Sequence, residues 1–142
     1  MQAFNEFEAK LKLAETMDLG DQLAAGWEAF QFIAMVADRY SGGTPEWGPA
    51  WMFTIPLACD GRDFLGQAPS MRRDSAPQVV LPKLAGISDA EAATGLAAIA
   101  KTLHESLHGI VATALGPADA QACAGAVEAA SELLEQLAAD EP

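Results

Sequence analysis

Cysteine and basic residues are scarce in this sequence, and each shortage excludes a class of protein. The two cysteines, Cys59 and Cys123, are too few for a disulfide framework and lack the CxxC spacing of a redox motif. A reducing cytoplasm is therefore the expected location. The chain has eight Lys and Arg residues and twenty Asp and Glu residues, which gives a formal net charge of −12. A nucleic-acid partner, which requires a basic surface, is not expected.

Long apolar runs and a basic N-terminus are also missing. No run approaches the roughly 18 apolar residues that span a bilayer. The N-terminus carries acidic residues (MQAFNEFEAK) where a signal peptide would have a basic stretch. The apolar content of 51% is ordinary for a globular protein. We therefore expect one soluble helical domain over residues 1–142, without membrane association.

Apolar residues recur at three- and four-residue steps over most of the chain, and this period predicts helices. We expect helices over residues 3–17, 21–40, 88–115 and 117–138. Asp21 is the expected N-cap of the second helix, and Ser88 with Glu91 forms a capping-box sequence. The two-residue connection Gly116-Pro117 would make the last two helices antiparallel neighbours. The predicted fold class is all-α, a bundle of four or five helices with one long irregular loop.

Residues 44–67 fit two structures. Their apolar spacing favours a helix, kinked near Pro56. The same segment alternates like a strand from Trp51 to Leu57, and Asp60-Gly61 could form a hairpin turn. We favour the helix, but short strands within residues 51–82 stay open.

Residues 68–87 contain three prolines and predict a long irregular connection, in which residues 78–81 could be extended. The connection also holds the only basic cluster of the chain, formed by Arg72, Arg73 and Lys83. We expect this cluster to lie against the acidic face of the last helix. The alternative is that it binds something anionic.

Both histidines belong to one motif, HESLH at residues 104–108, which matches the HExxH pattern. On a helix, His104 and His108 lie one turn apart and can bind one zinc ion, while Glu105 can act as general base on a zinc-bound water. The helical period places both histidines at the border of the buried face and Glu105 toward solvent.

In this motif, the last third of the chain resembles the gluzincin metallopeptidases, whose third zinc ligand is a glutamate on a following helix. The resemblance implies that His104, His108 and Glu128 are metal ligands and that Glu105 is the catalytic base. The chain departs from those enzymes at Lys101, where they usually have an apolar or small residue. Glu128 also falls on the polar side of its helix. The alternative interpretation is a pair of border histidines and a solvated glutamate.

The distribution of charge is one-sided toward the C-terminus. No Lys or Arg follows residue 101, and the acidic residues beyond it are Glu105, Asp119, Glu128, Glu132, Glu135, Asp140 and Glu141. This acidic face favours a basic protein surface as partner.

We therefore predict a non-enzymatic interaction or regulatory module without a cofactor. The alternative is a small gluzincin-like zinc-dependent hydrolase. A third hypothesis is a pocket for an apolar ligand around Trp27, Trp47 and Trp51.

Overall fold

A computed structural model of the chain describes residues 2–73 and 79–139. These residues form five helices and no strand, which confirms the all-α prediction. The helices are α1 (Gln2–Ala14), α2 (Leu19–Ser41), α3 (Gly48–Gly66), α4 (Asp89–Val111) and α5 (Pro117–Ala139). None of the helices in the described part is long and apolar enough to cross a membrane.

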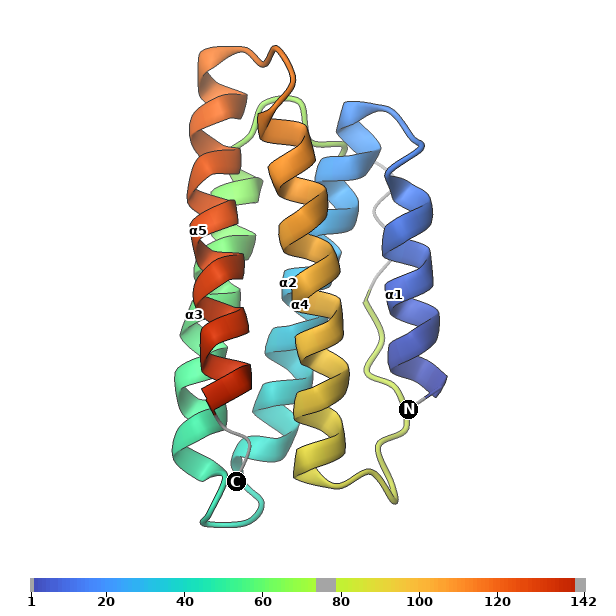
Figure 1. The fold of residues 1–142 in the computed structure, drawn as a ribbon, viewed down its shortest axis with the longest axis vertical. Helices are drawn as coiled ribbons and strands as arrows, with labels where there is room; N and C mark the ends of the chain where they lie inside the picture. Colours follow the sequence, from blue (N-terminus) through green and yellow to red (C-terminus); the bar gives the residue numbers. More distant parts are fainter. Residues whose placement is uncertain (1, 74–78, 140–142) are drawn as a thin grey trace.

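The helices run roughly along the long axis of a bundle (Figure 1). α2 packs on α3, α3 on α5 and α5 on α4, while α1 lies against α4 and, less closely, against α2. One apolar core fills the space between them. As the apolar stripe of α2 predicts, Leu23, Phe30 and Ile33 of this helix are fully buried in that core.

The start of α4 has the predicted capping box. The Ser88 hydroxyl accepts the N–H of Glu91 at 3.1 Å, and the Glu91 carboxylate accepts the N–H of Ser88 at 3.2 Å. The expected N-cap of α2 is wrong, because Asp18 caps this helix in place of Asp21. Asp18 has the extended backbone of a cap (φ −69°, ψ 168°), and its carboxylate accepts the N–H of Asp21 at 3.0 Å.

The predicted two-residue connection between the last helices is also wrong. α4 ends at Val111, and residues 112–116 connect it to α5. The Thr113 hydroxyl and N–H both donate to the carbonyl of Ile110, at 2.6 and 3.0 Å. This local hydrogen bonding satisfies a terminal carbonyl and stops the helix before Gly116.

The ambiguous segment is helical, so the alternative of short strands within residues 51–82 is wrong for its described residues. α3 continues through Pro56, and this residue is exposed. The predicted kink at Pro56 stays a prediction. Asp60-Gly61 is not a hairpin turn. Gly61 lies inside α3, where an added Cβ would come within 2.2 Å of the Phe30 ring. Packing against α2 therefore explains both the helix and its glycine.

The connection between α3 and α4 has neither helix nor strand in its described residues, as predicted. Residues 79–81 are not a strand, and Gln78 lies outside the described residues. The expected contact of the basic cluster with the last helix is wrong for Arg72. Its guanidinium pairs with Asp21 at 3.0 Å and Asp18 at 3.2 Å, at the start of α2. The backbone N–H of Arg72 also donates to the Gly20 carbonyl, and this hydrogen bond holds Arg72 at the start of α2.

Candidate functional site

The two histidines lie side by side on α4, as the helical period predicts. Their ring centroids are 6.0 Å apart and the ring planes differ by 14°. His104 is half-buried, His108 is exposed, and Glu105 between them points to solvent. The motif therefore presents two imidazoles at the surface of α4.

The gluzincin resemblance implies Glu128 as the third metal ligand beside these histidines. Within residues 2–73 and 79–139, no group of three or more His, Cys, Asp or Glu side chains is placed to hold a metal ion. α5 buries Cys123 and Ala130, and Glu128 falls on its exposed side. Tetrahedral zinc in a catalytic site takes three protein ligands. The pair supplies two, so the ligand set implied by the gluzincin resemblance stays a prediction.

The three tryptophans do not share one pocket. Trp51 is 1% exposed, and its indole N–H donates to Asp89 at 2.8 Å. Its ring packs against Trp47 and Tyr40, with centroids 5.9 and 5.3 Å away. Trp27 instead lines a separate hollow with Met71 and the two arginines that follow it. Trp47 and Trp51 thus pack with Tyr40 and Asp89 where helices meet, and Trp27 borders a separate hollow.

The solvent side of α3 carries an apolar ridge that the sequence did not predict. Met52 and Phe53 are 65% and 64% exposed, and Pro49 and Pro56 are exposed beside them. This i, i+3, i+4, i+7 spacing lines one face of a helix. The missed signal is that the N-terminal half of α3 is apolar around most of its circumference, more than one buried face requires.

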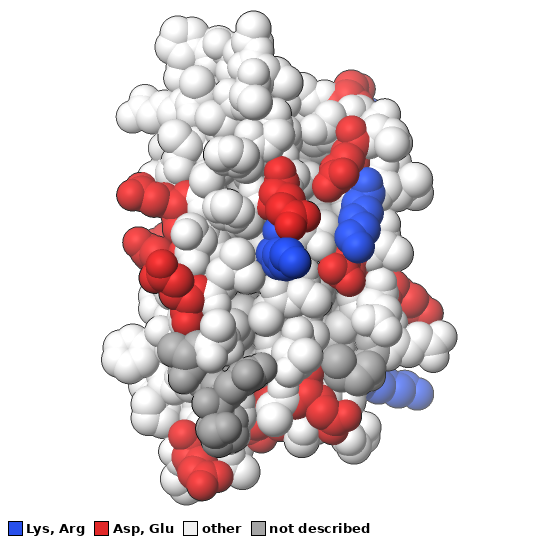
Figure 2. Space-filling model, viewed as in Figure 1, with Lys and Arg blue, Asp and Glu red and all other residues white. Residues whose placement is uncertain are grey.

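An acidic ridge lies on α5, the helix that packs on α3. Glu128, Glu132 and Glu135 are all exposed. Acidic side chains are visible on the side of the molecule where α5 lies, as well as on other parts of the same view (Figure 2). The chain directions in Figure 1 show that α3 and α5 are antiparallel.

Phe64 fixes the register of the two helices, because its ring covers Gly125, where an added Cβ would approach it to 2.5 Å. Counting equally along both helices from this contact brings Glu132 and Glu135 level with residues about 57 and 54 of α3. We call the apolar ridge (Pro49, Met52, Phe53, Pro56) with the acidic ridge (Glu128, Glu132, Glu135) the α3–α5 face.

The histidine pair and the α3–α5 face differ in what they could bind. The pair offers two nitrogen ligands to a metal ion. The face offers apolar area to a partner and, beside it, carboxylates that attract basic side chains. Comparisons of the chain with models of protein families, with curated proteins and with solved structures found no match.

Proposed function

We propose that this protein is a non-enzymatic helical interaction module that docks a basic amphipathic helix of a partner protein on the α3–α5 face. The observation that supports it most directly is the exposure of Met52 and Phe53 on α3, together with three exposed glutamates on α5, the helix that packs on it. An exposed apolar ridge rimmed by polar residues is typical of a protein-interaction surface. Its helical spacing suits a partner that presents apolar side chains in the same spacing.

The charges favour a basic partner over a second copy of the chain. A second copy of the chain would bring three more glutamates to this face, and like charges that meet across an interface cost free energy. The net charge of −12 adds to that repulsion. A helix with lysines flanking its apolar stripe would meet opposite charge at the same positions.

The test uses a synthetic amphipathic helix with leucines on one face and lysines on the other, labelled for fluorescence anisotropy. We expect it to bind more tightly than a scrambled peptide of the same composition. Replacing Met52 and Phe53 together by Ser should weaken binding roughly tenfold or more, because central apolar anchors dominate such interfaces. Replacing Glu128, Glu132 and Glu135 by Gln should slow association and flatten its salt dependence.

Matched variants lie elsewhere on the surface. Leu13 and Met17 are 62% and 46% exposed, so Leu13→Ser with Met17→Ser removes two exposed apolar side chains outside the α3–α5 face. Gln at Glu6, Glu15 and Glu105 removes the same charge from other exposed positions. Both controls should leave affinity unchanged. The docking face would be refuted if the scrambled peptide bound as tightly as the amphipathic one, since net charge alone would then explain binding. It would also be refuted if the control variants lost as much affinity as the variants of the α3–α5 face.

The alternative function, a zinc-dependent hydrolase, is supported by the stacked pair His104 and His108. It requires a further ligand that the described residues do not bring to this pair. Zinc binding by the purified protein distinguishes the two functions.

A further inference from the structure

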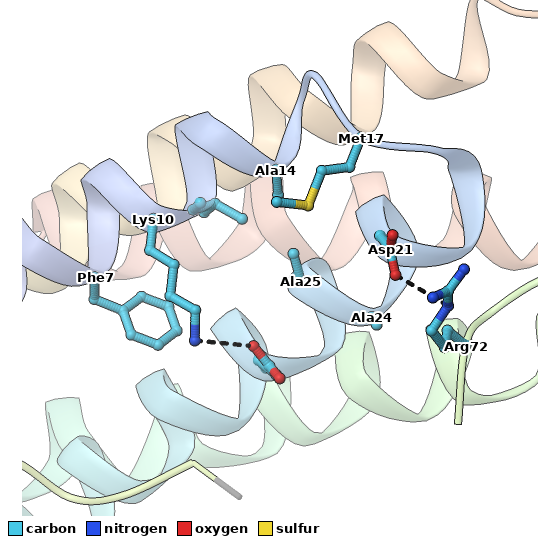
Figure 3. Close-up of a pocket in the computed structure, with 10 residues that line it drawn as sticks. Phe7, Lys10, Ala14, Met17, Asp21, Ala24, Ala25 and Arg72 are labelled. Carbon is cyan, nitrogen blue, oxygen red and sulfur yellow. Dashed lines mark ion pairs between the residues drawn. The ribbon is translucent and has the colours of Figure 1, made fainter. Parts of the chain in front are cut away.

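A cavity of about 240 Å³ lies between α1 and α2. It forms because α1 packs mainly on α4 and because the facing walls are small, with Ala14 on α1 and Ala24 and Ala25 on α2 (Figure 3). Leu11 and Met17 add apolar surface from α1 and the turn that follows it. An apolar cavity of about 150 Å³ is large enough to hold a benzene ring. The middle of this cavity therefore suits a small apolar body.

Each end of the cavity has an ion pair, and the two pairs are unequal. At one end, Arg72 is held by Asp21 at 3.0 Å and also by Asp18 at 3.2 Å. At the other end, the Lys10 ammonium lies 3.7 Å from the Glu28 carboxylate, which is longer than a hydrogen bond. Two carboxylates already neutralise Arg72, whereas Glu28 has a loose partner.

Glu28 is buried, whereas the Lys10 side chain that pairs with it is exposed to solvent. Its side chain is only 8% exposed, whereas that of Lys10 is 63% exposed. Burial raises the pKa of the Glu28 carboxyl above its ordinary value, and the charge of Lys10 offsets this in part. A closer cation would stabilise the buried carboxylate.

An aromatic ring lies at the same end of the cavity. Figure 3 shows the Phe7 ring beside the Lys10 side chain. Phe7 is held in place by stacking on Phe32, with centroids 4.3 Å apart. A carboxylate together with an aromatic face is the combination that recognises ammonium groups.

We infer that this cavity binds a small apolar amine. Its ammonium takes the place of the Lys10 ammonium between Glu28 and Phe7, and its apolar body lies over Ala14, Ala24 and Ala25. The acidic surface of the protein favours a cation over an anion here. This inference goes beyond the proposed function, since the cavity and the α3–α5 face use different helices.

The test compares three ligands with a similar apolar body, namely phenethylamine, phenethyl alcohol and hydrocinnamate, titrated into the full chain and followed by NMR. We expect saturable binding of phenethylamine that is roughly tenfold tighter than that of the alcohol, and no binding of hydrocinnamate. Ala25→Leu should block binding by filling the cavity. Lys10→Met should keep or raise the affinity for the amine, because it removes the competing ammonium.

The matched pair of charge variants is Glu28→Gln and Glu15→Gln, which both remove one carboxylate from the α1–α2 region. The first should weaken phenethylamine binding roughly tenfold, and the second should leave it unchanged. Equal effects of both variants, or no saturable binding, would overturn the inference. So would binding of hydrocinnamate that Lys10→Met abolishes, since the site would then take anions. If Ala25→Leu does not fold, the ligand series and the two glutamine variants still decide.

Discussion

Adding one methyl group at Gly61 should destabilise the protein, although alanine is the better helix former. In a helix interior, alanine is favoured over glycine by roughly 1 kcal/mol. At Gly61, however, the added Cβ would lie 2.2, 2.4 and 2.6 Å from three atoms of the Phe30 ring. Ordinary contact begins at 3.4 Å, so the ring would have to move by more than an ångström.

The surroundings of Phe30 set the size of the effect. Its side chain is 0% exposed, so the ring cannot turn into solvent. Overpacking a tight core costs typically 1–3 kcal/mol, and so severe an overlap belongs at the upper end or beyond. After subtraction of the gain in helix propensity, Gly61→Ala should lower the free energy of unfolding by about 2 kcal/mol.

Two other glycines provide controls for the same substitution. Gly109 lies in α4 with no atom within 4 Å of its added Cβ, so Gly109→Ala should stabilise by up to about 1 kcal/mol. Gly125→Ala meets Phe64, but that ring is 40% exposed and can move outward, so its effect should fall between the other two. Urea unfolding followed by circular dichroism measures all three. A Gly61→Ala variant as stable as Gly109→Ala would refute this account of how α2 and α3 pack.

Three further predictions concern polar groups. Asp89→Ala should cost about 1–3 kcal/mol in thermal or urea unfolding, because it leaves the buried indole N–H of Trp51 without that acceptor, and Asp89→Asn should restore most of the loss. Burial raises the pKa of the Glu28 carboxyl, so the folded state binds this proton more tightly than the unfolded state does. The protein therefore loses stability through Glu28 only as the pH rises above the ordinary pKa of 4.5. Glu28→Gln should therefore gain stability relative to the wild type as the pH rises from below 4.5 to neutral, and parallel urea curves with pH-independent differences would contradict this. The zinc hypothesis requires about one bound zinc per chain, lost in His104→Ala or His108→Ala. Metal analysis of untagged protein should show far less than one, because the pair has two ligands among the described residues.

The sequence alone determined the features that depend on neighbours within one helical turn. The all-α class, the capping box at Ser88 and the side-by-side placement of His104 and His108 follow from a repeat of 3.6 residues and from short-range hydrogen bonds. Local chemistry did not identify the N-cap of α2, and the prediction of Asp21 was wrong. Asp18 and Asp21 both suit an N-cap, and the difference is one turn of helix.

Tertiary structure decided which side of each helix is buried and which distant residues meet. The sequence of α3 fitted both a helical and a strand pattern, and only its packing on α2 and α5 shows that Trp51 is buried and Phe53 is exposed. The pairing of Glu28 with Lys10 depends in the same way on how α1 lies across α2. The physical reason is that periodicity places a residue on one side of a helix, whereas only packing against another helix removes that side from water.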